Sequence, residues 1–293
     1  MKMDRRDFLR LSLGASTGLA LTASGAGPAV AKPGPIDQRR VAANVQAIPR
    51  GARKGIGLAL GDQQGIKQLD SLNVNWFYTW GADYPDVRLT PGFVPMIWGG
   101  GAVQRGAVDD VVSELGATHA RELLGFNEPD HPEQSAMSVA SAINYWPELM
   151  ASGLRLGSPS PAKVTGTWLK QFMGHAAKKK LRVDFITMHS YPSPNSRAFL
   201  NSVQKLHNRY RKPIWITEFA VADWDATPGS PSRYTEQQVM TFMRETVAGL
   251  RRMPFVERFA WKTRAEGDPV MGKSALFHTD GSLTRVGQLY RSL

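Results

Sequence analysis

Residues 213–221 read Pro-Ile-Trp-Ile-Thr-Glu-Phe-Ala-Val, an apolar run rich in β-branched and aromatic side chains, with one carboxylate near its end. This composition predicts a buried β-strand. The segment Thr235–Met253 has the periodicity of a helix, and Thr235, with Gln238 three residues later, forms a capping box at its start. The stretch therefore predicts one strand followed by one helix.

The same unit recurs along the chain from Gly55 onward. Eight short runs predict strands, at Gly55–Gly61, Val74–Gly81, Phe93–Gly99, Glu122–Pro129, Leu154–Pro161, Phe185–Pro192, Pro213–Val221 and Arg258–Ala265. Helical patterns lie between them, such as Met137–Ser152 and Ser196–Arg211. Because regular alternation favours parallel strands, we predict a single (β/α)8 TIM barrel of the α/β class over residues 54–293. An open doubly wound sheet is the alternative.

The first residues have the order of an export signal. Arg5 and Arg6 precede an apolar stretch, residues 11–31 hold no charged side chain, and Ala29-Val30-Ala31 offers a cleavage site between small residues. The paired arginines resemble the twin-arginine export motif. We therefore predict a signal peptide over residues 1–31 that engages the twin-arginine export machinery.

This leader predicts an exported protein, periplasmic or extracellular, and a flexible segment over residues 32–53 before the barrel. An uncleaved membrane anchor is the alternative, although the glycines of the leader make it a poor membrane-spanning segment. We expect a monomer.

The composition excludes several kinds of chemistry. The chain has no Cys, so it has no disulfide, thiolate metal site or cysteine nucleophile. Its six His form no HExxH motif, and residues 54–293, the predicted barrel, contain no Gly-x-Ser-x-Gly. Residues 267–274 match the P-loop pattern, but too little chain follows them to build a nucleotide-binding sheet. We predict neither a metal nor a cofactor.

The formal net charge of +11 suggests a polyanionic partner. However, the basic residues are dispersed, and the densest groups, Lys178–Lys180 and Arg209–Lys212, fall at the ends of predicted helices. Cations are favourable at helix C-termini, so we predict no nucleic-acid partner. Attachment of these groups to an anionic cell envelope stays open.

Two of the predicted strands end with a glutamate. The fourth ends Gly125-Phe126-Asn127-Glu128-Pro129 and the seventh ends Thr217-Glu218-Phe219. The carboxyl ends of barrel strands meet at one mouth, so Glu128 and Glu218 can face each other across a cleft. A carboxylate emerging from a buried strand costs desolvation energy unless it is paired or used. Two carboxylates across a cleft are the requirement for glycoside hydrolysis, so we predict both as catalytic.

Ring side chains also gather at this predicted mouth. The apolar faces of sugar rings stack on exposed aromatic side chains, whereas aromatics deeper in a strand pack in the core. We assign Trp76 and Trp215 to the core. Five ring side chains at or near strand ends are predicted to line the cleft: Trp80, Trp98, His189, Tyr191 and Trp261.

Motifs on four predicted strands resemble glycoside hydrolase family 128, a clan A (β/α)8 family of β-1,3-glucanases. They are Trp98-Gly-Gly, Asn127-Glu128-Pro, His189-Ser-Tyr191-Pro and Trp215-Ile-Thr-Glu218-Phe. The resemblance covers residues 55–293. It implies retaining hydrolysis of the polysaccharide β-1,3-glucan, with Glu128 as acid/base and Glu218 as nucleophile.

The same resemblance implies further roles. Asn127 would bind the sugar 2-hydroxyl, Tyr191 would orient Glu218, and Trp261 would correspond to the aromatic residue of the clan on strand eight. Endo and exo action both stay open. The alternatives are a non-catalytic glycan-binding barrel, which the two carboxylates disfavour, and a clan A hydrolase or transglycosylase for another β-glycan.

Overall fold

The computed structural model describes residues 53–84, 89 and 91–293 of the 293-residue chain. The predicted signal peptide and the segment before the barrel lie outside the described residues, except that Arg53 opens the first strand. No helix in the described part of the chain is long and apolar enough to cross a membrane.

The described residues form eight strands: β1 (Arg53–Gly57), β2 (Trp76–Tyr78), β3 (Gly92–Phe93), β4 (Glu122–Leu123), β5 (Arg155–Leu156), β6 (Ile186–Ser190), β7 (Ile214–Phe219) and β8 (Val256–Trp261). Six pair in the order β3-β2-β1-β8-β7-β6, and β4 pairs with β5. Parallel bridges from Met96 to Leu124 and from Gly157 to Phe185 join the two sheets. The ring of strands is therefore closed, which confirms the predicted TIM barrel and excludes the open sheet.

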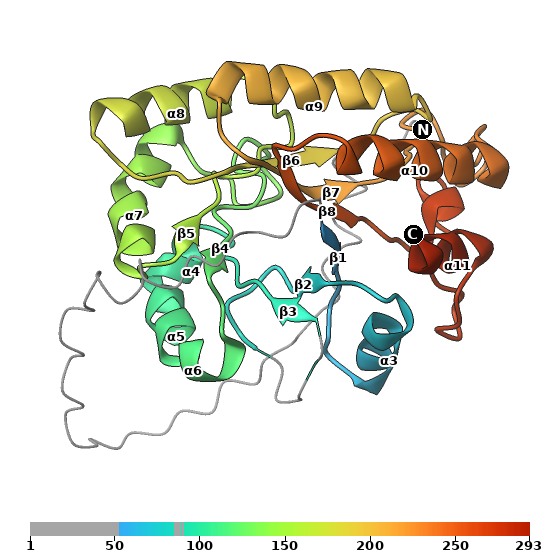
Figure 1. The fold of residues 1–293 in the computed structure, drawn as a ribbon, viewed down its shortest axis with the longest axis horizontal. Helices are drawn as coiled ribbons and strands as arrows, with labels where there is room; N and C mark the ends of the chain where they lie inside the picture. The colour runs from blue at the N-terminus through green and yellow to red at the C-terminus, as the bar shows by residue number, and fades with distance from the viewer. Residues whose placement is uncertain (1–52, 85–88, 90) are drawn as a thin grey trace.

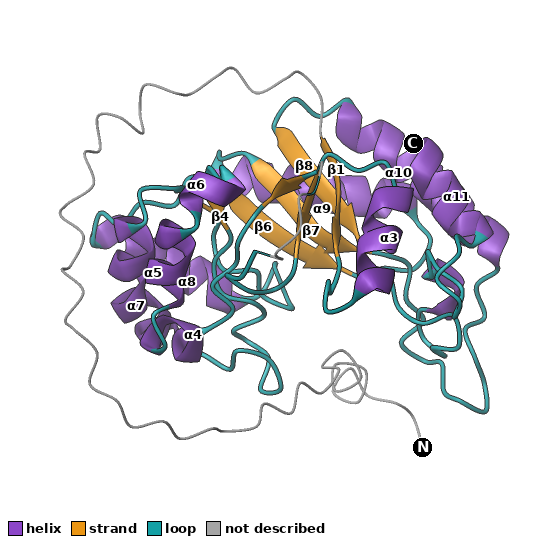
Figure 2. Cartoon of the chain, turned by 90° about the horizontal axis from the view of Figure 1, so that it is seen from below, coloured by secondary structure: helices purple, strands orange, loops and turns teal. Residues whose placement is uncertain are grey.

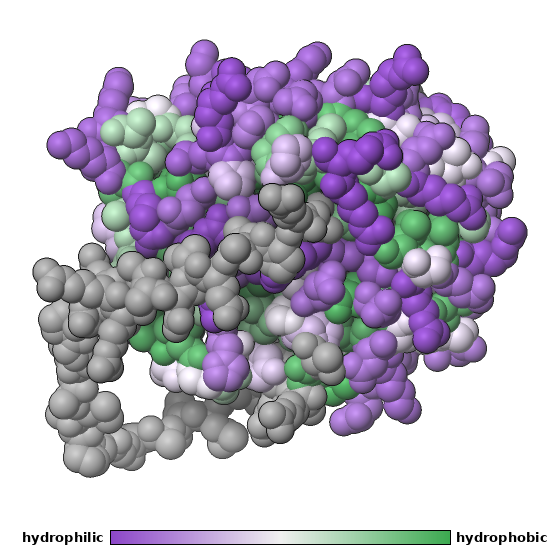
Figure 3. Space-filling model, in the orientation of Figure 1, coloured by the Kyte–Doolittle hydropathy of each residue, from purple (hydrophilic) through white to green (hydrophobic). Residues whose placement is uncertain are grey.

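Helices surround this ring (Figures 1 and 2). The longer ones are α3 (Gln63–Ser71), α7 (Val139–Ala151), α8 (Thr167–Lys178), α9 (Ser196–Tyr210), α10 (Glu236–Arg251) and α11 (Arg285–Ser292). The shorter ones are α4 (Gly100–Gln104), α5 (Ala107–Ser113), α6 (Leu115–Thr118) and the 3-10 helix η1 (Gly272–Ser274). The predicted capping box of Thr235 and Gln238 is present at the start of α10. The exposed faces of the helices are mostly hydrophilic on the side shown in Figure 3.

Two apolar clusters fill the fold because side chains alternate between the two faces of a strand. The outer cluster packs the strands against the helices and includes Ile216, Phe219 and Trp261. The inner cluster fills the barrel with Trp76, Tyr78, Val94, Met96, Leu124, Phe185, Trp215 and Ala260. Trp76 and Trp215 are thus core residues, as predicted.

Charged side chains close the end of the barrel where the strands begin. Arg258, 9% exposed, donates to Glu122 Oε2 at 2.8 Å, and Arg155 Nη1 lies 3.6 Å from Glu122 Oε1. Arg155 also donates to both oxygens of Glu257, at 3.1 and 3.2 Å. Trp215 Nε1 donates to Glu257 Oε2 at 2.8 Å, and the Arg258 guanidinium lies 4.1 Å from the Trp215 ring centroid. We call Arg155, Arg258, Glu122 and Glu257 the basal cluster.

Candidate active site

Glu218, at the carboxyl end of β7 and 5% exposed, is the centre of a network of donors. Its Oε1 accepts hydrogen bonds from Trp80 Nε1 at 2.7 Å and from the Tyr78 hydroxyl at 3.0 Å. Its Oε2 accepts one from the Tyr191 hydroxyl, and Lys262 Nζ lies 3.6 Å away. Groups at the ends of β2, β6 and β8 therefore fix both oxygens of this carboxylate.

One extra residue in β7 turns Glu218 toward this network. The segment Ile216–Phe219 pairs with a stretch of β8 that is one residue shorter, and the pairing with β6 shifts between Met188 and His189. Such a β-bulge re-aims the side chains next to it. Ile216 packs outside the barrel, so strict alternation would place Glu218 outside as well. The bulge brings Glu218 to the interior together with Thr217.

Glu128, 2% exposed, follows β4 and meets Glu218 through one imidazole. His189 Nδ1 lies 3.1 Å from Glu128 Oε1, and His189 Nε2 lies 3.7 Å from Glu218 Oε1. The φ of Glu128 is +38°, in the left-handed region that side chains other than glycine rarely adopt. Its Oε2 is buried and has no hydrogen-bond partner among the described residues. Strain together with an orphaned polar atom is typical of a functional site rather than of a packed core.

The surroundings determine the charge of each group. Burial alone would raise the pKa of Glu218, but the positive charges of His189 and Lys262 and the hydrogen bonds from Tyr191 and Trp80 lower it to about 2. Burial opposes the charged form of His189, yet Glu218 and Glu128 raise its pKa above the usual value. Glu218 is therefore ionised at neutral pH.

The two tyrosines are neutral donors. Burial, together with the charge of Glu218, raises the pKa of Tyr191 well above its usual value, and Tyr78 is affected in the same way. Both hydroxyls therefore keep their protons and donate hydrogen bonds to the carboxylate.

Asn127, 4% exposed, lies beside Glu128. Its backbone N–H donates to Trp98 O at 2.9 Å, which joins the segments that follow β3 and β4. Its Nδ2 donates to Gln134 Oε1 at 2.9 Å, while Asn127 Oδ1 and Gln134 Nε2 are buried without a hydrogen-bond partner in the described part of the chain. The amide is therefore held in place with polar atoms left over for a ligand hydroxyl.

The structure corrects the prediction for Trp261. This side chain is fully buried in the outer cluster, its ring centroid lies 5.0 Å from that of Phe219, and its Nε1 donates to Ser274 O at 2.9 Å. It cannot offer a face to a sugar ring, because the end of β8 turns Trp261 outward. The next residue, Lys262, takes the inward position that we had expected to be aromatic.

Trp80 and Trp98 are half-buried and pack on the inner cluster at the mouth. Trp80 has a φ of +62°, and Lys262 Nζ lies 3.9 Å from its ring centroid. Trp80 therefore contacts the Glu218 network directly, whereas Trp98 stays a predicted sugar platform.

Two residues that contact Glu218 were not among the predicted site residues: Tyr78 and Lys262. Tyr78 shares a strand face with Trp76 and Trp80, so strand alternation could have placed it in the barrel. Lys262 directly follows a mostly apolar strand, and a charged residue at a strand end is the same pattern that identified Glu218.

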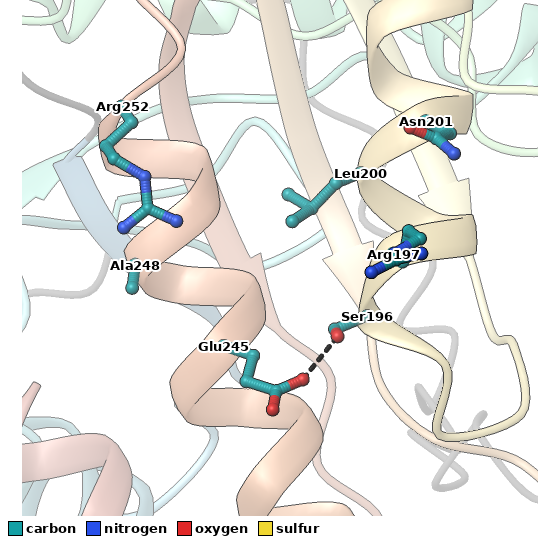
Figure 4. A pocket seen from close by; sticks show the side chains of 7 residues that line it. All are labelled: Ser196, Arg197, Leu200, Asn201, Glu245, Ala248 and Arg252. Carbon is teal, nitrogen blue, oxygen red and sulfur yellow. Dashed lines mark hydrogen bonds between the residues drawn. The ribbon is translucent and has the colours of Figure 1, made fainter.

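A separate cavity of about 440 Å³ lies between α9 and α10 on the outside of the barrel (Figure 4). The Ser196 hydroxyl donates to the Glu245 carboxylate across it. Its lining contains none of the predicted site residues: Ser196, Arg197, Leu200, Asn201, Glu245, Ala248 and Arg252. We therefore take the mouth of the barrel, and not this cavity, as the candidate active site.

Comparisons with known proteins agree with this geometry. The family described as glycosyl hydrolase catalytic core matches residues 56–290. The structure is similar to a subgroup I endo-β-1,3-glucanase of glycoside hydrolase family 128 from Amycolatopsis mediterranei, solved with laminaripentaose (33% identity, TM-score 0.71, 83% of this chain and 99% of that chain). It is also similar to the subgroup II endo-β-1,3-glucanase of that family from Sorangium cellulosum (31% identity, TM-score 0.68, 82% and 98%).

A curated relative is the alkali-sensitive linkage protein 1 of Schizosaccharomyces pombe, 32% identical over 230 residues. The match covers 75% of this chain but only 40% of the length of that relative. The family match, over residues 56–290, includes both Glu128 and Glu218. The chain therefore belongs to glycoside hydrolase family 128, within the glycosyl hydrolase catalytic core family.

Proposed function

We propose that the protein is a retaining β-1,3-glucanase in which Glu218 is the nucleophile and Glu128 the acid/base. The observation that carries this assignment is the asymmetry of the two carboxylates, which contact the same imidazole. Glu218 is surrounded by donors and cations that keep it ionised, whereas Glu128 has a buried oxygen without a hydrogen-bond partner in the described residues. Double displacement needs a charged carboxylate as nucleophile and a second carboxyl group that can reach the leaving oxygen, and the fixed donors around Glu218 suit the first role.

The reaction proceeds in two steps. A Glu218 oxygen attacks the anomeric carbon while the glycosidic C–O bond breaks, and the leaving oxygen takes the proton from Glu128. In the second step a water molecule gives a proton to the Glu128 carboxylate while the water oxygen attacks the same anomeric carbon. The bond from that carbon to Glu218 breaks, and Glu218 leaves as a carboxylate. Two inversions retain the β configuration.

Tyr78, Tyr191 and Trp80 orient the nucleophile by donating to its two oxygens. Asn127, held by Gln134, supplies a polar atom for the sugar 2-hydroxyl, a contact that strengthens toward the transition state. Support for a β-1,3-linked substrate comes from the two solved relatives, both of which are endo-β-1,3-glucanases. We therefore propose internal cleavage of β-1,3-glucan.

Proton NMR of the first products from laminarin tests the proposal. We expect β-configured reducing ends to appear before mutarotation, in oligosaccharides of mixed length. Initial appearance of the α anomer would mean inversion and would remove Glu218 as nucleophile. Cellulose, mannan and mixed-linkage glucan serve as parallel substrates, and hydrolysis of one of them in place of laminarin would reassign the substrate.

We also propose that the protein is exported through the twin-arginine machinery, supported by Arg5, Arg6 and the uncharged stretch that follows them. Changing both arginines to lysine keeps the charge but removes the paired guanidinium groups. We expect the double variant to stay in the cytoplasm at full length. Normal export and processing of this variant would refute the route.

A further inference from the structure

Lys262 is a largely buried charged group that the two-step reaction does not by itself require. Its side chain is 11% exposed, and its backbone N–H donates to Phe219 O at 2.9 Å, which fixes the end of β8 against β7. Its ammonium lies 3.6 Å from Glu218 Oε2 and 3.9 Å from the Trp80 ring centroid. An ammonium removed from water needs compensating partners, and here these are a carboxylate and the face of an indole ring.

We propose that Lys262 is a positioning residue that, together with Trp80, holds the carboxylate of the nucleophile in one orientation. We call Lys262 and Trp80 the brace. The contacts form a closed triangle: Lys262 meets Oε2 of Glu218, Trp80 Nε1 donates to Oε1, and the ammonium lies over the indole ring. Rotation of the carboxylate would break at least one side of this triangle. This inference rests on the proposed role of Glu218 as nucleophile.

The backbone of Trp80 supports the inference. Its φ of +62° lies in the left-handed region, which is costly for a bulky side chain. Such strain persists where the surrounding contacts compensate for it. Trp80 contacts Tyr78, Glu218 and Lys262, so its strained backbone serves this arrangement and does not end a helix.

The brace also affects the charge of the nucleophile. Four titratable groups face Glu218: His189 and Tyr191 at β6, Tyr78 of β2 and Lys262 after β8. Glu128 acts on Glu218 through His189, and the charge of Arg264 acts on Lys262. Burial lowers the pKa of Lys262 and Glu218 opposes that change. Without Lys262, one cation fewer faces Glu218, so the carboxylate should take up a proton at a higher pH.

The experiment compares kcat/KM on laminarin from pH 2 to 8, a range that reaches the lowered pKa of Glu218, for the wild type, Lys262→Met, Lys262→Arg and Lys205→Met. Methionine keeps the length of the side chain without its charge, arginine keeps the charge, and Lys205 is exposed on α9. We expect Lys262→Met to move the acid limb up by about one unit or more, with roughly tenfold lower kcat/KM below that limb. Lys262→Arg should keep the acid limb of the wild type, and Lys205→Met should match the wild type throughout.

Trp80→Phe provides a second test if Lys262→Met folds poorly, which its melting temperature would show. This variant keeps an aromatic face for the ammonium and removes the Nε1–H donor, so its acid limb should also rise. An unchanged acid limb in folded Lys262→Met would overturn the inference, as would equal loss in Lys262→Met and Lys262→Arg. Absence of laminarin hydrolysis by the wild type would instead refute the proposed function.

Discussion

The two ends of the barrel each hold a group of charged side chains, and the two groups differ in how completely their polar atoms are paired. In the basal cluster, Glu122 and Glu257 meet a donor or a cation at both oxygens. At the mouth, the buried atoms Glu128 Oε2, His189 Nε2 and Asn127 Oδ1 have no hydrogen-bond partner in the part of the chain that the structure describes. A fully paired cluster stabilises the fold, whereas unpaired buried atoms are available to a ligand.

Backbone strain follows the same division. His119 and Arg211 have positive φ angles near the start of the strands, but each ends a helix, where the left-handed conformation is common. Trp80 and Glu128 at the mouth have positive φ angles outside any helix end. The strain at the base completes secondary structure, while the strain at the mouth positions side chains of the site.

The largest effect should come from Glu218→Ala, which removes the nucleophile. We expect kcat on laminarin to fall by roughly 10⁴-fold or more, as for other covalent nucleophiles. Added azide should occupy the vacated space and attack an activated β-glucoside, and NMR should identify the α-glucosyl azide. A β-glucosyl azide, or full activity of the variant, would contradict the role of Glu218.

The basal cluster should respond in the opposite way. Arg258→Met removes one partner of a buried ion pair, so the free energy of unfolding in urea should fall by about 3 kcal/mol. The kcat/KM of the folded variant should stay near the wild-type value, because the cluster lies at the other end of the strands. Arg244→Met, on an exposed site of α10, is the control and should leave stability unchanged. A large loss of kcat/KM with intact stability would break the contrast between the two ends.

The mouth should dominate the pH dependence of stability. The lowered pKa of Glu218 means that its ionised form stabilises the folded state above pH 4.5 and loses that effect as pH falls toward 2, by about 3 kcal/mol at most. The raised pKa of His189 means that its protonated form stabilises the folded state below pH 6.5, and this contribution is lost as the pH rises above that value. Urea unfolding of the wild type and Glu218→Gln should therefore differ most between pH 4.5 and 6.5. An equal difference at pH 3 would argue against this assignment.

The smallest effect should come from Trp98→Ala at the rim of the mouth. We expect the binding of the transition state to weaken by about 1–3 kcal/mol, the range for one large apolar contact, which lowers kcat/KM on laminarin. The melting temperature should change little. Trp261→Ala is the matched comparison, and it should lower the melting temperature because that side chain is fully buried. If Trp98→Ala unfolds the protein without changing the kinetics, Trp98 belongs to the core.

The sequence by itself predicted the barrel, its parallel strands and the two glutamates. Apolar runs alternating with helical periodicity are local patterns, and a carboxylate at the end of such a run, as in Asn127-Glu128 or Thr217-Glu218, is visible without knowledge of its neighbours. The capping box at Thr235 is likewise written within four residues.

Only the tertiary structure decided which way the side chains at the strand ends face. Glu218 turns inward because the segment Ile216–Phe219 of β7 has one residue more than the stretches of β6 and β8 that pair with it. At the end of β8, Trp261 turns outward and Lys262 inward. The imidazole of His189 meets both glutamates only because β6 lies beside β7 in the closed ring. These features depend on the register between strands far apart in sequence, and a shift of one residue reverses the face of every side chain beyond it.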